Sequence, residues 1–370
     1  DGGDNEKWMV LLRDLMIENH NYEKSPDELC AIINKALDFP VQKPGFPEDS
    51  FSLSTSSFLT HSRASLKIQD GCNNNCSFCA IHIARGHSVS IPAETAIQRV
   101  IELEKAGQSE IVLTTVNIAQ YKSEYNGKSI NFSGLLRLLL QNTKNICFRI
   151  SSLYPEIVDD DFCDVIKDSR VRPHFHISVQ SGSDKILSLM NRRYTAAQVK
   201  QACDRLRKAK ENPFIACDII TGFPAETDED FNQTMNLCKA CNFSWVHAFP
   251  FSERKGTDAC KLKPKIPQSV SGERSKIITD WAIEQKINYI KSYVGKSLNL
   301  ILEVSRNKES PLLENGEYIY HGMTENFIHC ELRSKALYKN SSSVKIIIES
   351  PFPERIKKGG EIEAKAHIIQ

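Results

Sequence analysis

The chain has 370 residues, of which 41% are hydrophobic and 25% charged, with a formal net charge of +1. This length exceeds what one hydrophobic core usually holds, so two or three domains are expected, and the composition excludes a collagen-like chain, a disulfide mini-scaffold and a largely disordered chain. The balanced charge does not indicate a globally basic nucleic-acid binder. No run of residues approaches the ~20 apolar positions of a membrane span and no secretion signal is apparent, so we expect no membrane association and a cytoplasmic location.

Residues 1–62 are predicted to form two helices and a linker. The helices are expected over Lys7–Ile17 and Pro26–Ala36, and a Pro/Ser-rich linker follows over Phe39–Ser62. Nothing in this stretch resembles a complete domain. We therefore interpret it as the remnant of a truncated N-terminal domain or as a linker.

Residues 63–294 alternate between short apolar strands and amphipathic helices. Strands are predicted at 64–70, 110–116, 147–151, 174–179, 214–221 and 243–249. Helices are predicted at 92–106, 132–141, 159–168, 184–190, 195–210, 227–241 and 267–294. This alternation predicts an α/β fold with a parallel sheet covered by helices. Six units favour a partial, TIM-like (βα)6 barrel over the alternative of a flat doubly wound sheet.

Residues 295–370 change to an all-β pattern. Short strands separated by Gly, Asn and Ser turns are predicted at 297–304, 317–322, 326–332, 344–349 and 361–369. Strands of this length in such a short segment predict a small barrel of the oligonucleotide-binding (OB) kind.

Three of the twelve cysteines carry the strongest chemical signal. Cys72, Cys76 and Cys79 have the spacing C-x3-C-x2-C directly after the first predicted strand. Three thiolates can hold three irons of a [4Fe–4S] cluster and leave the fourth iron open to a small chelating ligand. The alternative is a structural zinc ion with His82 or His87 as the fourth ligand. A second cysteine pair, the C-x-x-C at 238–241, is interpreted as part of the core, with a redox or metal role left open.

Polar residues at the predicted carboxyl ends of the strands form a second set of candidates, because folds of this kind place their chemistry there. Arg193 can pair bidentately with a carboxylate, or it is a surface arginine in a basic run. Asp218 lies inside an apolar strand and is expected to be paired or to face the pocket. Side chains that can hydrogen-bond a ribose or a carboxylate, or simply cap a loop, are Asn117, Ser151, Ser152 and Gln180.

The cysteine motif resembles the signature of the radical S-adenosylmethionine (SAM) superfamily. The surrounding sequence is similar to the methylthiotransferases within it, at 66–74, 84–86, 114–118, 149–152, 176–183, 190–194 and 218–227. The motifs Ile68-Gln69-Asp70-Gly71, Ala84-Arg85-Gly86 and Thr324-Glu325-Asn326-Phe327 look most like the branch that methylthiolates N6-threonylcarbamoyladenosine in tRNA. The β segment from residue 295 looks like that family's TRAM RNA-binding module.

The resemblance implies a [4Fe–4S] cluster on the three cysteines whose open iron chelates SAM, and methylthiolation of carbon 2 of the modified adenine at position 37. It implies no catalytic side chain beyond the cluster and SAM. Phe78 is similar to the family's aromatic residue at the adenine pocket. The other predicted cofactor-binding residues follow from residue type and position at strand ends and turns: Asn117, Ser151, Ser152, Gln180, Arg193, Asp218, Gly222, Phe223 and Pro224. Candidate substrate or RNA contacts are His247, Arg254, Lys255 and Phe327, with a solvated basic face and barrel core as the alternatives for the last three. The implied partners are a tRNA anticodon stem-loop and an electron donor such as flavodoxin or ferredoxin.

The chain also departs from the family pattern. Family members carry an N-terminal domain with three more cysteines that hold a second [4Fe–4S] cluster, whereas only Cys30 precedes the motif here. We therefore expect the second cluster's ligands to be absent from this chain. Other possible substrates are isopentenyladenosine in tRNA and an aspartate of a ribosomal protein. The alternative from another class is a zinc-bearing RNA-binding protein.

Overall fold

The computed structural model describes residues 51, 62–303, 313, 316–339 and 341–369. The chain divides into two compact units, residues 1–52 and 53–370. All the helices and strands described below belong to the second unit. The helices predicted at Lys7–Ile17 and Pro26–Ala36 lie outside the described residues. Within the part that is described, none of the helices has both the length and the apolar character needed to cross a bilayer.

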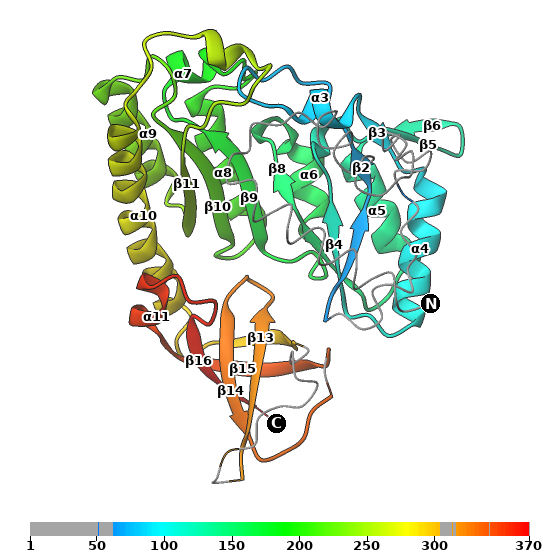
Figure 1. Cartoon of the computed structure of the whole chain (residues 1–370). Helices are drawn as coiled ribbons and strands as arrows, with labels where there is room; N and C mark the ends of the chain where they lie inside the picture. The colour runs from blue at the N-terminus through cyan, green and yellow to red at the C-terminus, as the bar shows by residue number, and fades with distance from the viewer. Residues whose placement is uncertain (1–50, 52–61, 304–312, 314–315, 340, 370) are drawn as a thin grey trace, which may run out of the picture. The chain divides into compact units, whose positions relative to one another are not determined.

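Parallel strands that follow one another in chain order form the main body (Figure 1). One sheet contains β1 (Ala64–Lys67), β4 (Glu110–Thr114) and β7 (Cys147–Ile150). The other contains β8 (Ser152–Leu153), β9 (His174–Gln180), β10 (Phe214–Thr221) and β11 (Trp245–Pro250). Only Ser151 separates β7 from β8, so a single stretch of chain joins the two sheets. With β7 and β8 counted as one interrupted strand, six parallel strands follow one another, which agrees with the six predicted strand–helix units.

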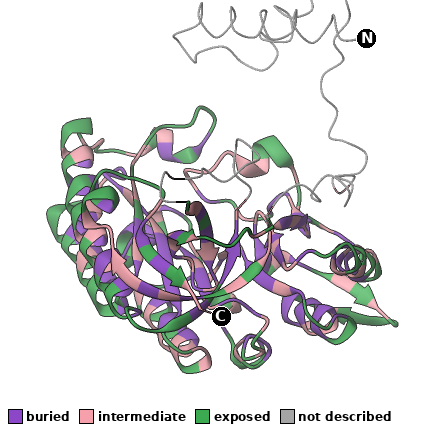
Figure 2. Cartoon of the chain, turned by 90° about the horizontal axis from the view of Figure 1, so that it is seen from below, coloured by how far each residue is buried: buried purple, intermediate pink, exposed green. Residues whose placement is uncertain are grey.

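Helices cover the outer side of these strands and begin at recognisable caps. At α8 and α9, Thr195 and Thr227 each form a capping box with the residue three positions on. The buried side of α4 carries Ala96, Val100 and Leu103 at helical spacing. Figure 2 shows the outcome, with buried residues along the strands and exposed residues on the outer helix faces. The helices are α4 (Ala93–Lys105), α5 (Phe132–Asn142), α6 (Asp160–Val165), α7 (Asp184–Leu189), α8 (Ala196–Ala209), α9 (Asp228–Cys241) and α10 (Gln268–Lys291).

A closed five-stranded barrel follows α10, as the all-β pattern predicted. Around the barrel the strands run in the order β12, β13, β14, β16, β15. Their bounds are β12 (Ser297–Leu302), β13 (Tyr318–Thr324), β14 (His329–Ser334), β15 (Ser343–Pro351) and β16 (Ala364–Ile368). A short helix not predicted from the sequence, α11 (Pro353–Lys357), connects β15 to β16.

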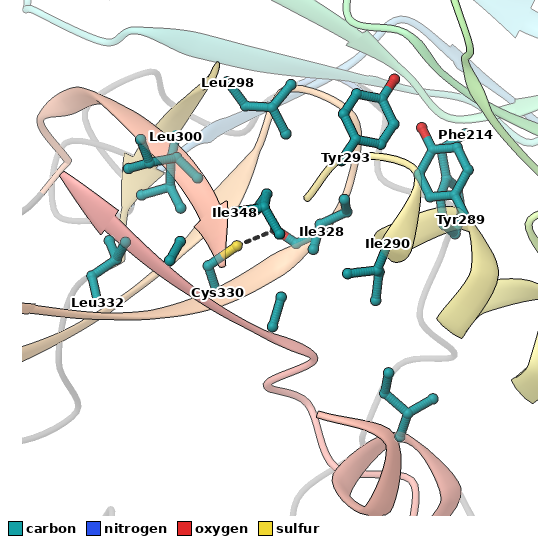
Figure 3. Packing of buried hydrophobic residues seen from close by; sticks show 14 of the residues in the cluster. Phe214, Tyr289, Ile290, Tyr293, Leu298, Leu300, Ile328, Cys330, Leu332 and Ile348 are labelled. Atoms are coloured by element: carbon teal, nitrogen blue, oxygen red, sulfur yellow. Dashed lines mark hydrogen bonds between the residues drawn. The ribbon is translucent and has the colours of Figure 1, made fainter. Parts of the chain in front are cut away.

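The barrel shares its core with the end of α10 and the start of β10 (Figure 3). Inside the barrel, Leu300, Leu332 and Ile348 are fully buried. They belong to the same hydrophobic cluster as Ile290 of α10 and Phe214 of β10. Burial of apolar surface is the main favourable term in folding, so the barrel and the parallel strands stabilise one another.

Several short elements near the first sheet were not predicted. A hairpin of β5 (Ser123–Tyr125) and β6 (Lys128–Ile130) turns at Asn126-Gly127, where both residues have positive φ angles. This is the Asn-Gly hairpin turn, a local signal that the sequence does contain. The other unpredicted elements there are β3 (Val89–Ser90), α3 (Ile81–Arg85) and the 3₁₀ turns at Ile118–Gln120 and Pro155–Ile157, and a further 3₁₀ turn, Asp258–Lys261, follows β11. The strand predicted at 64–70 is divided into β1 and β2 (Gln69–Asp70).

Candidate functional site

The three motif cysteines lie on the loop between β2 and α3, and the start of this loop is held rigidly. Gly71 has a φ of +67°, and a Cβ at this position would lie 2.0 Å from the carbonyl oxygen of His87. The Asp70 carboxylate accepts bonds from Lys67 Nζ (2.8 Å) and Arg85 Nη1 (3.0 Å). Burial alone would raise the pKa of Asp70, but these bonds and the one from the Gly71 N–H lower it. The carboxylate therefore stays ionised and ties both ends of the loop together.

Polar hydrogens point at the cysteine sulfurs. The backbone N–H groups of Asn74 and Ile81 donate to Cys72 Sγ (3.4 Å) and Cys79 Sγ (3.5 Å). The buried Asn117 amide also donates to Cys72 Sγ, over 3.8 Å. Hydrogen bonds to cysteine sulfurs are typical of the protein surroundings of iron–sulfur clusters.

Gln69 positions Asn117, and the sequence reasoning assigned no role to Gln69. Its side chain is fully buried between β2 and the end of β4. Its amide nitrogen donates to the Gly71 carbonyl (2.7 Å), and its amide oxygen accepts from the Asn117 backbone N–H (2.8 Å). A glutamine inside the alternating pattern of the first strand was the only available signal.

The far end of the cysteine loop is attached to two distant segments. The Ser77 N–H donates to the Met190 carbonyl (3.1 Å), and the Ala259 N–H donates to the Ser77 carbonyl (2.7 Å). Asn191 Nδ2 donates to the Asn75 carbonyl (2.6 Å). The loop is therefore fixed to the end of α7 and to the segment after β11, across the carboxyl ends of the strands.

Arg192 is a second functional candidate that the sequence reasoning did not select. Its guanidinium lies over the rings of Phe78, Tyr154 and Tyr194, at 5.5, 5.2 and 5.6 Å from their centroids. Its Nε and Nη1 are buried and have no hydrogen-bond partner. Its side chain also hydrogen-bonds Tyr154. Buried polar groups are almost always paired, so the two remaining N–H groups beside the cysteines fit a site for an anionic group.

The cysteine site is electrostatically tuned by two neighbouring arginines. Burial raises the pKa of the Cys76 thiol, and the charges of the other two cysteines add to this rise. The charges of Arg192 and, to a smaller extent, Arg193 oppose it. Arg193, the arginine selected from the sequence, has an exposed side chain at this position.

The cysteine loop and the inner side of β10 and β11 line a common cavity. A cavity of about 360 Å³ is lined by Phe78 of the loop together with Gln180, Asp218, Phe249 and Arg254. Four of the predicted site residues therefore meet in one place. Gln180 adopts a positive φ of 70°, and the register between β9 and β10 shifts beside it.

The remaining predicted cofactor-binding residues lie at the β7–β8 junction and in the turn after β10. Ser151 and Ser152 lie at the junction of β7 and β8, and Ser151 Oγ is 3.5 Å from Thr115 Oγ1. Gly222 packs against Ser271 of α10 with a φ of +69°, and its N–H donates to Glu226 (2.6 Å). Phe223 is fully buried, with its ring edge-on to Phe78, and Pro224 follows it in the turn.

Two predicted RNA contacts lie apart from this cavity. Lys255 is exposed on the loop after β11. Phe327 belongs to the barrel, and its ring stacks on His174 at a centroid distance of 4.0 Å. Phe327 therefore contacts the amino-terminal end of β9, whereas the cysteine loop lies at the carboxyl ends of the strands.

Cys238 and Cys241 of the C-x-x-C pair are fully buried on α9. Two further cysteines contact this pair. The contact with Cys241 raises the pKa of Cys203, and burial together with the contact to Cys238 raises the pKa of Cys217. The full burial of Cys238 and Cys241 agrees with their interpretation as core residues.

The cysteine loop suits a cluster with several irons. In the described residues, no three His, Cys, Asp or Glu side chains converge closely enough to share one metal ion. A cuboidal cluster does not require such convergence, because each thiolate binds a different iron. The N–H donors at two sulfurs and the unsatisfied Nε and Nη1 of Arg192 fit a negatively charged cluster with an anionic ligand beside it.

Comparisons with known proteins agree with this geometry. Residues 66–238 match the model of the radical SAM superfamily. The chain is 49% identical over 255 residues to a threonylcarbamoyladenosine tRNA methylthiotransferase of Treponema pallidum, covering 69% of this chain and 52% of the relative. It is 33% identical over 272 residues to a tRNA-2-methylthio-N(6)-dimethylallyladenosine synthase of Sodalis glossinidius, covering 73% and 57%. The chain thus spans about half the length of these relatives.

Among solved structures, the radical SAM enzyme coproporphyrinogen III oxidase of Escherichia coli is similar with a TM-score of 0.43 and 13% identity. The match covers 88% of this chain and 78% of that one.

Proposed function

We propose, from the premise that this chain carries a radical SAM domain, that it acts in the methylthiolation of tRNA. The proposed reaction is attachment of a methylthio group to carbon 2 of N6-threonylcarbamoyladenosine at position 37. The observation that carries the proposal is the rigid loop of three cysteines beside the unsatisfied Nε and Nη1 of Arg192. The higher identity to the threonylcarbamoyladenosine relative favours this substrate over the dimethylallyl one.

In this proposal Cys72, Cys76 and Cys79 hold a [4Fe–4S] cluster, and SAM binds at its open iron. When bound, this pair supplies hydrogen-atom abstraction. The chain's own residues prepare the site: Asn117 and the loop N–H groups stabilise the thiolates, and Arg192 offers its free N–H groups to an anion such as the SAM carboxylate. Phe78 supplies an aromatic face next to the inner cavity. Flavodoxin or ferredoxin is the proposed class of electron donor.

We assign the β12–β16 barrel as a TRAM-like module that binds the anticodon stem-loop. Its β14–β15 connection supports this role, because Leu337 is 75% exposed between Arg333 and Lys339, which are also exposed. An exposed apolar side chain among cations suits RNA, which offers both phosphates and unstacked bases. We propose a cytoplasmic location, where tRNA is modified.

The Cys76→Ala variant tests the proposal directly. Anaerobic reconstitution of the unaltered chain is expected to give about four irons and four sulfides per chain and, with a reductant, 5′-deoxyadenosine from SAM. The variant is expected to lose both, whereas Cys147→Ala, a cysteine away from the loop, keeps them. A colourless protein that holds one zinc ion and makes no 5′-deoxyadenosine would contradict the proposal.

A further inference from the structure

Below the inner cavity, three polar side chains lie on the same face of neighbouring strands. In the parallel register, Asp218 of β10 lies opposite His247 of β11, and Ala216 lies opposite His176 of β9. Since side chains alternate along a strand, these residues face the same side as Phe249, which lines the cavity with Asp218. His176, Asp218 and His247 therefore form, with Phe249, one continuous face of β9, β10 and β11, which we call the wall and which extends inward from the cysteine loop.

The hydrogen-bonding state of His247 follows from its neighbour. The Trp245 indole N–H donates to His247 Nδ1 over 3.2 Å. Because an indole can only donate, Nδ1 carries no proton, and we assign the proton of the neutral ring to Nε2. Burial and the nearby His176 lower the pKa of His247, which keeps the ring neutral. His247 thus presents one N–H donor, while Asp218 beside it presents carboxylate acceptors.

Neither group is saturated by the protein. Among the described residues, the partner recorded for Asp218 is His176, whose Nε2 lies 3.2 Å from the carboxylate but is not aligned for a hydrogen bond. Next to them, Phe249 exposes 51% of its surface, and its ring is nearly parallel to that of His247. The wall therefore combines a flat aromatic surface with an adjacent donor and acceptor that await a ligand.

The lower end of this wall is closed by packing. His174 stacks against Phe327 of the barrel, and Lys286 of α10 lies 4.7 Å from the centre of the Trp245 ring. Above this closed end, His247 is exposed and Asp218 lines the cavity beside the cysteine loop, so both are accessible to a ligand in that cavity.

We propose that Asp218 and His247 bind the N6 appendage of the target adenosine and select a ureido appendage over an apolar one. This inference rests on the proposed function. A threonylcarbamoyl group carries urea N–H donors and a carbonyl acceptor, which complement the Asp218 carboxylate and the His247 Nε2–H. A dimethylallyl group offers neither and would leave both protein groups desolvated without partners. Carbon 2 and N6 share one edge of adenine, so the appendage lies along this wall when carbon 2 faces the cofactor.

The test compares the binding of RNAs that differ only in the appendage. Three labelled anticodon stem-loops carry N6-threonylcarbamoyladenosine, N6-dimethylallyladenosine or unmodified adenosine, and their Kd values for the reconstituted full chain are measured by fluorescence anisotropy. The unaltered chain should bind the threonylcarbamoyl RNA on the order of tenfold to a hundredfold more tightly than the dimethylallyl RNA. Asp218→Ala and His247→Phe should each remove most of this preference without weakening binding of the unmodified RNA.

Conservative and distant variants separate recognition from folding. Asp218→Asn keeps an acceptor and His247→Gln keeps an N–H donor, so both should retain part of the preference. Asp280→Asn, which removes a surface partner of Lys276 on α10, should retain all of it. Equal weakening of all three RNAs by Asp218→Ala and His247→Phe would indicate a purely structural role and overturn the inference.

The same experiment distinguishes the two proposals. If the unaltered chain cleaves SAM in response to RNA but binds both modified RNAs equally, the inference fails and the proposed function stands. If it binds no stem-loop and produces no 5′-deoxyadenosine, the proposed function fails, and the inference fails with it.

Discussion

At the scale of single residues, the site depends on a cation whose importance only burial reveals. Arg192 and Arg193 are adjacent in a basic run, and the sequence offers no reason to distinguish them. The fold packs the first among Phe78, Tyr154 and Tyr194, where its Nε and Nη1 are buried, and leaves the second exposed. The three cysteines could be predicted because their spacing is local. The role of Arg192 could not, because it arises from tertiary packing.

Arg192 should control the acidity of the Cys76 thiol. Its charge is the largest influence that opposes the effect of burial, so Arg192→Leu is expected to raise the pKa of Cys76 further. Fewer thiolates at a given pH mean slower reaction, and we expect alkylation of Cys76 in the metal-free chain to slow several-fold near pH 8. Peptide mapping after iodoacetamide pulses at several pH values measures this. Arg193→Leu is the matched control and should have a smaller effect; equal effects would refute the assignment.

At the scale of elements, the strands that carry the site were well predicted, and the short connections were not. The prediction for β10 has the observed bounds, and α9 starts one residue later than expected. These elements are long enough for their periodicity to be read. The hairpin at 123–130 has strands of three residues, too short for any periodic signal. The role of Gln69 was missed for another reason, because its amide oxygen accepts from the backbone of Val116 and Asn117, more than forty residues along the chain.

The cysteine loop should be more sensitive to substitution at Gly71 than at Gly86. Both glycines have positive φ angles, yet a Cβ at Gly71 would strike the His87 carbonyl at 2.0 Å, while one at Gly86 meets nothing within 4 Å. Gly86→Ala is expected to cost about 1–2 kcal/mol of unfolding free energy through backbone strain alone, because φ 72° with ψ −157° is a conformation that favours glycine. Gly71→Ala should cost about 3 kcal/mol or more and reduce iron incorporation. Urea unfolding and iron analysis measure both effects; similar losses for the two variants would contradict the role of the close approach.

At the scale of the whole described unit, a buried ionic network joins the parallel strands to the barrel. Glu110 binds Arg149 Nε (2.8 Å) and Arg172 Nε (2.6 Å). These arginines also reach the barrel, at the Thr324 carbonyl (3.1 Å) and at Glu325 (3.4 Å). Burial would raise the pKa of Glu110, but the two arginines outweigh it and lower the pKa. The sequence prediction placed only an RNA contact here, at Phe327. The junction itself could not be predicted, because a contact between distant segments leaves no local pattern.

The junction should also make stability depend on pH through His174. Burial, with the nearby charges of Arg149, His176 and Lys286, holds the pKa of His174 well below 6.5, so the folded protein keeps this ring neutral. The unfolded chain takes up a proton below about pH 6.5, so the stability contributed by the neutral ring is complete above that pH and is lost as the pH falls, by up to about 1.4 kcal/mol per unit. In His174→Phe the ring can still stack on Phe327, but this proton uptake is gone. Urea unfolding of both proteins at pH 7.5, 6.5 and 5.5 should therefore show a shallower loss of stability in the variant. Comparing slopes removes any constant difference in packing, and parallel slopes would mean that His174 is already protonated, or free to become so, in the folded junction.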